Sequence, residues 1–264
     1  MSVLRHLFSP EGDAALAATM AMRPLLAFDF DGTLAPIVPR PDDARVPMPV
    51  ARRLDRLARV LPLAIISGRS IDDVRARLSF EPHFVIGNHG AENPFDATEA
   101  SPAALDGMRE RVRAHAAEIG RAGIQIEDKA YSMALHYRLA RDREAARALI
   151  DRLVRDPGTG VLSYGGKMVV NVVCADAPDK AHAVASLVAR CQVSSAVFLG
   201  DDVNDEPVFA RAEPTWLTVK VGREDPHSLA RFRLDAQGEV AIMLDRMLGL
   251  LDAAGVGSTG GADL

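Results

Sequence analysis

The chain has 264 residues, a net charge of −5 and 48% hydrophobic residues, a size and composition that allow one large domain or two small ones around a substantial core. An acidic balance without a Lys/Arg cluster argues against nucleic acid as a partner. No apolar run is long enough to cross a membrane, and the first residues lack the features of a signal peptide. Only two cysteines are present, Cys174 and Cys191, so buried thiols in a reducing cytoplasm are expected rather than a disulfide.

A strand–helix rhythm runs through the first 90 residues. The apolar patterns predict helices over residues 10–20, 50–60 and 71–78 and strands over 25–30, 63–66 and 84–86. Between the first strand and the second helix, a loop over residues 36–49 contains five prolines, which exclude helix and central strand. Strands that alternate with helices in this way indicate right-handed crossovers and a parallel sheet.

The rhythm changes in the middle of the chain and later returns. Helical patterns over 105–119 and 142–154 and strand patterns over 124–127, 133–139, 161–164 and 168–173 predict a separate α+β layer. The first rhythm resumes with a helix over 179–191, strands over 196–199 and 216–219 and a helix over 239–251; a glycine-rich, disordered tail is expected from residue 255. We therefore predict an α/β fold: a Rossmann-like parallel-sheet core formed by residues 1–97 and 177–264, with an inserted α+β domain over 98–176.

Polar, glycine-containing clusters follow four of the predicted strands. They span residues 29–33, 67–69, 88–90 and 201–205. Ligands bind outside the carboxyl ends of parallel strands, so these clusters are expected to meet at one edge of the sheet. On an extended chain Asp29 and Asp31 would point to the same side and would need a cation between them. A simple strand-end turn at Asp31-Gly32 is the alternative interpretation.

The residue types in the clusters favour phosphate chemistry. Carboxylates with one lysine, Lys180, and without cysteine suggest Mg²⁺ rather than Zn²⁺. One carboxylate can attack phosphorus and form an aspartyl-phosphate, and a second can protonate the leaving oxygen and then activate water. Lys180 and the backbone amides that follow Asp31, those of Gly32 and Thr33, can balance the phosphate charge.

In order and spacing, the motifs at Asp29, Ser67, Lys180 and residues 200–205 resemble those of the haloacid dehalogenase superfamily of phosphatases. The resemblance implies Asp29 as nucleophile, Asp31 as general acid/base, and Ser67 and Lys180 as phosphate ligands. It also implies a Mg²⁺ site formed by the side chains of Asp29 and Asp201 and the backbone carbonyl of Asp31. The expected supporting residues around metal-bound water and Lys180 are Asp202, Asn204 and Asp205.

Further motifs along residues 25–250 resemble the trehalose-6-phosphate phosphatase family, in which the inserted layer is a cap over the disaccharide. On this resemblance the substrate contacts are expected at Gly32, Thr33, Ser67, Gly68, Arg69, Asn88, His89, Glu127, Arg138, Lys167 and Asn171. Asn171 is a departure, because the family usually has glutamate there. An amide cannot accept two hydroxyl hydrogen bonds with a full negative charge, so this substitution bears on sugar specificity rather than on phosphate chemistry.

Three functions are compatible with these motifs. The first is Mg²⁺-dependent hydrolysis of trehalose 6-phosphate in trehalose biosynthesis, by a cytoplasmic protein for which a monomer is slightly favoured. The second is the same chemistry on another phosphorylated sugar. The third is a non-enzymatic phosphate-sensing module like a receiver domain, which the Asp29–Asp31 spacing and the large insertion disfavour.

Overall fold

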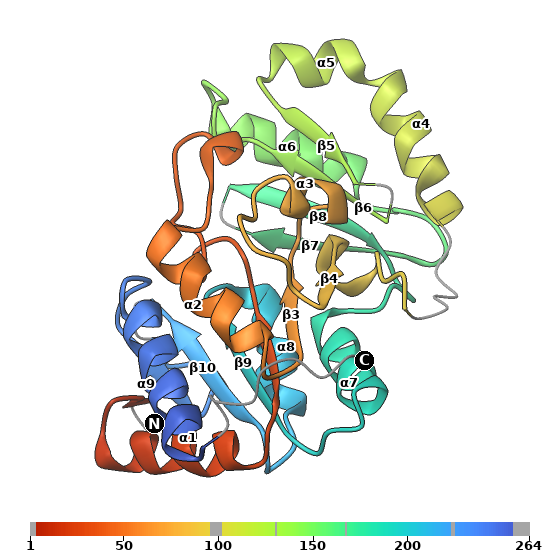
Figure 1. The fold of residues 1–264 in the computed structure, drawn as a ribbon. Coiled ribbons are helices and arrows are strands. Elements are labelled where there is room, and N and C mark those ends of the chain that lie inside the picture. The colour runs from red at the N-terminus through yellow and green to blue at the C-terminus, as the bar shows by residue number, and fades with distance from the viewer. Residues whose placement is uncertain (1–3, 96–101, 130, 167, 223–224, 256–264) are drawn as a thin grey trace. The chain divides into compact units, whose positions relative to one another are not determined.

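The structure is a computed structural model that describes residues 4–95, 102–129, 131–166, 168–222 and 225–255, and Figure 1 shows its fold. The chain forms two compact units, one of Met1–Gly90 with Asp179–Leu264 and one of Ala91–Pro178. We call them the core unit and the inserted unit. The domain boundaries expected after residues 97 and 176 stay a prediction, and the expected disordered tail lies almost entirely outside the described residues.

A seven-stranded sheet organises the core unit, in the order β1-β11-β10-β9-β2-β3-β4 and with every neighbouring pair parallel. Its strands are β1 (Arg5–His6), β2 (Leu25–Phe28), β3 (Leu63–Ile66), β4 (Phe84–Ile86), β9 (Ala196–Gly200), β10 (Leu217–Val221) and β11 (Phe232–Leu234). Its helices are α1 (Pro10–Ala21), α2 (Met48–Ala58), α3 (Ile71–Arg75), α7 (Lys180–Arg190), α8 (Glu206–Arg211) and α9 (Glu239–Ala253). The chain leaves β2 for β3 on one side and returns to β9 on the other, so the carboxyl end of β2 lies at the switch point of the sheet.

Helices cover both faces of this sheet, which explains why β2 is apolar along its whole length. Leu26 and Phe28 belong to the same buried cluster as residues of α1, α2 and α9. On the opposite face, Phe198 of β9 makes an edge-to-face contact with Phe209 of α8, with ring centroids 5.9 Å apart. Figure 1 shows α1, α2 and α9 grouped together and α7 beside α8. The parallel α/β core is confirmed.

The inserted unit is an antiparallel sheet with helices on one face. Its strands are β5 (Gln125–Asp128), β6 (Ser132–His136), β7 (Val161–Gly166) and β8 (Val169–Cys174), in the order β5-β6-β8-β7. Its helices are α4 (Asp106–Ala114), α5 (Ala116–Arg121) and α6 (Arg143–Leu153). Met133, Leu135 and Val172 of the sheet share a buried cluster with Leu149 and Ile150 of α6. The predicted α+β insertion is therefore confirmed.

Several elements differ from their predictions. The single helix predicted over 105–119 is broken at His115, whose Nδ1 lies 2.9 Å from the Arg111 carbonyl oxygen at the end of α4. The helix predicted to reach residue 78 ends at Arg75. The edge strand β1, its neighbour β11 and the short helix α8 were not predicted, because two to six residues give no readable period. No helix among the described residues has both the length and the apolar character that a membrane span requires.

Candidate active site

Lys180 joins two carboxylates at the carboxyl ends of β2 and β9. It is the first residue of α7, and its Nζ donates to Asp29 Oδ1 at 2.6 Å and to Asp205 Oδ1 at 2.7 Å. All three side chains are buried, with exposed fractions of 3%, 7% and 0%. Asp179 caps α7 by accepting from the His182 amide, which fixes the start of the helix and hence the place of Lys180.

Asp201 completes a cluster in which oxygens of Asp29, Asp201 and Asp205 lie within 4.8 Å of one another. Burial and the neighbouring Asp205 raise the pKa of Asp201 to about 7. Burial raises the pKa of Asp29 as well; Lys180 opposes this shift, and Asp205 and Asp201 add to it. With all three carboxylates ionised, the single ammonium would leave two negative charges uncompensated, a deficit that matches a divalent cation.

The donor set also fits such a cation. Within the described residues, the buried Asp201 Oδ1 has no hydrogen-bond partner, so it carries a lone pair available to a ligand. All three ligand candidates are carboxylate oxygens, the ligands that Mg²⁺ prefers. A β-carbon on Gly32, whose φ is +81°, would lie 2.1 Å from Asp201 Oδ2. The Asp201 carboxylate therefore occupies space that only a glycine at position 32 leaves open.

Asp31 and Asp29 have different charged partners, and the backbone between them is not extended as the prediction assumed. The chain turns after β2: the Gly32 amide donates to the Ala35 carbonyl, and the Leu34 amide donates to the Phe30 carbonyl. The Asp31 carboxylate instead accepts two hydrogen bonds from Arg69, at 2.7 and 2.8 Å. The turn interpretation of Asp31-Gly32 is thus correct in geometry.

Thr33 lies in the same turn and is fully buried. Among the described residues no hydrogen-bond partner is found for its hydroxyl oxygen. A buried hydroxyl without a protein partner is costly to keep. A bound anion would supply the missing acceptor.

Backbone hydrogen bonds interlock the loop after β3 with the loop after β4. The Asn88 amide donates to the Arg69 carbonyl and the His89 amide to the Ser67 carbonyl. Asn88 and His89 both have positive φ, 48° and 59°, a conformation that few residues other than glycine adopt, although Asn and His adopt it more often than most. A β-carbon on Gly68 would lie 2.3 Å from the His89 ring. The predicted substrate residues Ser67, Gly68, Arg69, Asn88 and His89 are therefore packed as one group.

The loop after β9 is held by its own acids. Asp205 accepts from the Asp202 amide at 3.0 Å, and the Asp202 carboxylate accepts from the Val203 amide and from Asn204 Nδ2. A β-carbon on Gly200 would lie 2.2 Å from the Asp205 carboxyl carbon. This glycine is therefore required for Asp205 to reach Lys180.

Sequence reasoning missed two charged groups near these loops. Lys220, in the middle of the apolar strand β10, is 6% exposed, and its Nζ lies 3.4 Å from the Asp202 carbonyl oxygen. Asp73 accepts from both Arg69 and Arg77; these hydrogen bonds outweigh its burial and lower the pKa of Asp73. A lysine inside a strand and the four-residue spacing of Arg69, Asp73 and Arg77 were the available signals.

The remaining predicted residues belong to the inserted unit. Glu127, on β5, pairs with His136 at 3.1 Å and with Lys129 at 3.4 Å, and the hydrogen bond from His136, reinforced by Lys129, lowers the pKa of Glu127 to about 2. Asn171 lies on β8, and Arg138 is exposed in the turn after β6. Lys167 lies outside the described residues.

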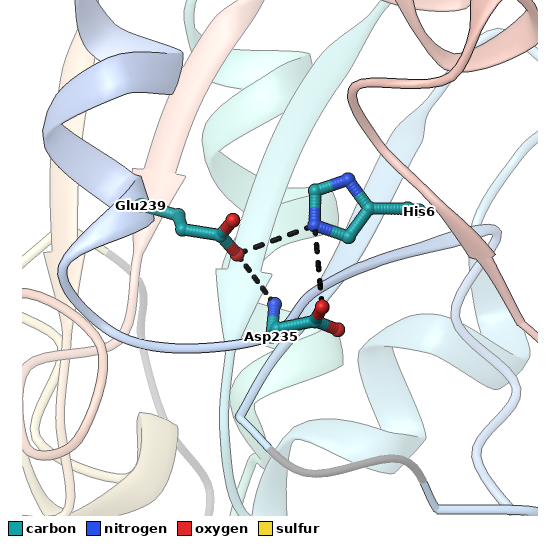
Figure 2. A group of neighbouring side chains, drawn as sticks. All are labelled: His6, Asp235 and Glu239. Atoms are coloured by element: carbon teal, nitrogen blue, oxygen red, sulfur yellow. Dashed lines mark hydrogen bonds and ion pairs between the residues drawn. The ribbon is translucent and has the colours of Figure 1, made fainter.

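A second group that could hold a metal, His6, Asp235 and Glu239, is shown in Figure 2. Its geometry favours a structural role. His6 Nδ1 accepts from the Phe8 amide, so in the neutral ring the proton is on Nε2, the atom that faces Glu239 at 3.3 Å. Glu239, the first residue of α9, also accepts from the Asp235 amide, and the Asp235 carboxylate pairs with Arg233. These contacts hold β1 and α9 at the sheet edge.

Comparison with known proteins finds relatives of similar sequence and fold. The trehalose-phosphatase family model matches residues 27–237. A probable trehalose-phosphate phosphatase of Sinorhizobium fredii is 34% identical over 213 residues, which cover 78% of this chain and 80% of that protein. An uncharacterized glycosyl hydrolase of Mycobacterium tuberculosis is 31% identical over 243 residues, covering 85% of this chain and 18% of that protein. The chain spans between 18% and 63% of the length of its mycobacterial relatives.

Among solved structures, the C-terminal domain of the C. albicans trehalose-6-phosphate phosphatase shares the fold, with a TM-score of 0.73 at 21% identity over 94% of this chain and 99% of that one. A family match over most of the chain, with the same α/β core and inserted antiparallel sheet, confirms the resemblance drawn from the motifs. The chain belongs to the trehalose-phosphatase family.

Proposed function

We propose that this protein is a Mg²⁺-dependent phosphatase that hydrolyses trehalose 6-phosphate to trehalose and phosphate through an aspartyl-phosphate on Asp29. The observation that carries the proposal is the buried Lys180, bonded to both Asp29 and Asp205, with Asp201 beside them. A carboxylate that a lysine holds in place is suited to receive a phosphoryl group. The excess negative charge of the cluster around it suits a divalent cation. The names of the curated relatives support the substrate.

In the first step the Asp29 carboxylate attacks phosphorus, and the bond from phosphorus to the sugar oxygen breaks. The Asp31 carboxyl gives its proton to that oxygen, so the sugar leaves as an alcohol. In the second step a water attacks the aspartyl-phosphate and Asp31 takes the proton of the water, which regenerates Asp29 and frees phosphate. Lys180 keeps Asp29 in place and offsets negative charge in both steps. Thr33 and Ser67 would bind the phosphate oxygens.

The side chains of Asp29 and Asp201 and the backbone carbonyl of Asp31 would hold Mg²⁺. When bound, the ion neutralises the charge that builds up on the phosphate oxygens. Asp202 and Asn204, which contact each other, would support the water shell, and Asp205 fixes Lys180. The cytoplasmic location and the monomeric state stay predictions.

Phosphate release from trehalose 6-phosphate, with and without Mg²⁺, tests the proposal. We expect multiple turnovers of trehalose 6-phosphate. Phosphate release should stop when EDTA is added and resume when Mg²⁺ is restored. Asp29→Asn should remove turnover of both trehalose 6-phosphate and p-nitrophenyl phosphate, while Asp55→Asn, an exposed residue of α2 paired with Arg59, serves as the matched control. Turnover retained in Asp29→Asn would contradict the nucleophile assignment, and the absence of turnover in the wild type would favour the phosphate-sensing alternative.

A second candidate keeps the chemistry and changes the sugar, because Asn171 places an amide on β8 where a carboxylate would bind hydroxyl groups more strongly. A panel of phosphorylated sugars separates the two candidates. A clear preference for another sugar phosphate would replace trehalose 6-phosphate as the substrate. If Asn171→Glu leaves the ranking of the panel unchanged, position 171 does not set specificity.

A further inference from the structure

The sheet of the inserted unit has one face that its own helices leave open. Met133, Leu135, Val170 and Val172 share a buried cluster with residues of α4, α5 and α6. Side chains alternate across a strand, so the residues between them point to the opposite face. On β6 and β8 these include Ala134 and Asn171, which are directly paired. We call this surface the open face.

Two glycines fix the orientation of β7 independently. A β-carbon on Gly165 would lie 3.5 Å from Arg147 Nη1 of α6, so Gly165 faces the helices. A β-carbon on Gly166 would lie 3.6 Å from Asn171 Nδ2, so Gly166 shares the open face with Asn171. Tyr164, two residues before Gly166, therefore also points to the open face. It is partly exposed there.

Register places Tyr164 in one row with residues already proposed to meet the sugar. Glu127 pairs with Ala134, Ala134 with Asn171, and Asn171 with Tyr164. With strands about 4.8 Å apart, this row extends about 14 Å across the four strands. A carboxylate, a small side chain, an amide and an aromatic ring follow one another along it. The carboxylate stays ionised, since the pKa of Glu127 is lowered to about 2.

This sequence of groups suits a ligand that presents hydroxyl groups on its edges and an apolar face. The Asn171 amide can both donate and accept hydrogen bonds, and the Glu127 carboxylate accepts them. Neither covers an apolar surface, which an aromatic ring with a polar tip can do. We propose that Tyr164 is a specificity-determining residue whose ring packs against the sugar of the phosphorylated substrate, beside Asn171. This inference rests on the proposed sugar-phosphate phosphatase activity.

Steady-state kinetics of three variants test it on the full-length protein with Mg²⁺. Tyr164→Ala should raise KM for trehalose 6-phosphate about tenfold or more, which corresponds to one lost contact of about 1.4 kcal/mol, with little change in kcat. Tyr164→Phe keeps the ring and should stay within about threefold of the wild type. Ser163→Ala, the neighbouring residue on the opposite face, is the matched control and should match the wild type. Hydrolysis of p-nitrophenyl phosphate, which has no sugar, should be unchanged in all three.

The outcomes separate this inference from the activity on which it rests. Wild-type turnover of trehalose 6-phosphate is measured first; if another sugar phosphate is preferred in the panel, the variants are measured on that substrate. Wild-type protein that hydrolyses p-nitrophenyl phosphate but no sugar phosphate would overturn both the proposed substrate class and the role of Tyr164. A folded Tyr164→Ala with unchanged KM for the preferred sugar phosphate would overturn the role of Tyr164 alone. An equal loss on both substrates would identify Tyr164 as structural.

Discussion

The core unit and the inserted unit both pair a lysine with carboxylates, but in opposite surroundings. In the core unit the Lys180 side chain is 3% exposed between fully buried partners. In the inserted unit the Lys129 side chain is 22% exposed and its partner Glu127 51%. Buried charges interact strongly and have one arrangement, whereas exposed pairs are screened by solvent. The core cluster is thus suited to a reaction that needs its charged groups held in one arrangement. The inserted unit is suited to a surface whose charged side chains adapt to a ligand.

The largest effect is expected where the buried pair is broken. Lys180→Met should leave Asp29 and Asp205 facing each other without a cation, at a cost of about 3–5 kcal/mol in the free energy of unfolding. Turnover of p-nitrophenyl phosphate should fall at least about a hundredfold. Urea unfolding in EDTA and initial rates measure the two effects.

A double variant distinguishes charge from packing in this experiment. In Lys180→Met/Asp205→Asn one of the opposed charges is gone, so stability should recover in part while activity does not. If the double variant is no more stable than Lys180→Met, repulsion between the two carboxylates does not cause the loss of stability in Lys180→Met.

A glycine pair tests how tightly the core cluster is packed. Gly32→Ala places a β-carbon 2.1 Å from Asp201 Oδ2, whereas Gly222→Ala, also at positive φ, meets nothing within 4 Å. Both should lose about 1–3 kcal/mol of stability through backbone strain. Only Gly32→Ala should also lose activity, by about a hundredfold, because Asp201 must move. Equal activities of the two variants would show that the contact with Asp201 is unimportant.

Arg69, in the core unit, tests whether a charged residue there affects sugar and aryl substrates alike. Its side chain is 13% exposed and donates hydrogen bonds to both Asp31 and Asp73. Arg69→Met should therefore lower kcat about tenfold on sugar and aryl substrates alike. A loss of this size is at the lower end of the range for one charged hydrogen bond, about 1.5–3 kcal/mol. Arg69→Lys should recover only part of the rate. The lysine restores the positive charge, but one ammonium cannot reproduce the two parallel hydrogen bonds of the guanidinium. A loss confined to the sugar substrate would return Arg69 to the substrate-binding role predicted from sequence.

Glu127→Gln should show the opposite selectivity. Removing the charge from the row on the open face should raise KM for trehalose 6-phosphate about fivefold to tenfold, in line with one weakened charged hydrogen bond, and should leave p-nitrophenyl phosphate turnover unchanged. Asp128→Asn, the next residue of β5, paired with Arg109, is the matched control. An effect of Glu127→Gln on both substrates would contradict the division of roles between the units.

The smallest effect is the pH dependence of the Glu127 pair. Its pKa is lowered from 4.5 to about 2, so the native state favours the ionised form, and the stabilisation is complete above about pH 4.5 and lost as pH falls toward 2. Because half of the side chain is exposed, the difference in unfolding free energy between wild type and Glu127→Gln should be below about 1 kcal/mol and should shrink in high salt. If the difference in unfolding free energy between wild type and Glu127→Gln is constant from pH 7 to pH 3, the ionised form of Glu127 is not its source.

Sequence alone predicted the parallel core and the inserted layer because both carry a clear hydrophobic period. Leu25–Phe28 is apolar on both faces and wholly buried, as a strand covered by two helix layers must be. Alternation along β8 likewise matched its burial. Short elements such as β1 were invisible because their pairing is decided by distant residues: Arg5 pairs with Phe232.

The candidate site was predicted in its residues but not in its geometry. Convergence of strand ends in a parallel sheet predicted that Asp29, Asp201 and Asp205 lie at one sheet edge, and oxygens of the three lie within 4.8 Å of one another. It could not predict that the Asp31 carboxylate accepts from Arg69, since this depends on the backbone of one turn. Tyr164 was not singled out, because it comes to lie beside Asn171 only through strand register.

The bond between Lys180 and Asp29 joins residues 151 positions apart in the chain, and this separation has a consequence for synthesis on the ribosome. Until α7 has emerged, Asp29 has no lysine beside it, and β2 lacks its neighbour β9. Contacts of such long range form late and slow folding. The emerging first half of the core should therefore be inert. Activity should appear in one step only after β10, β11 and α9 have followed residues near 205 out of the exit tunnel.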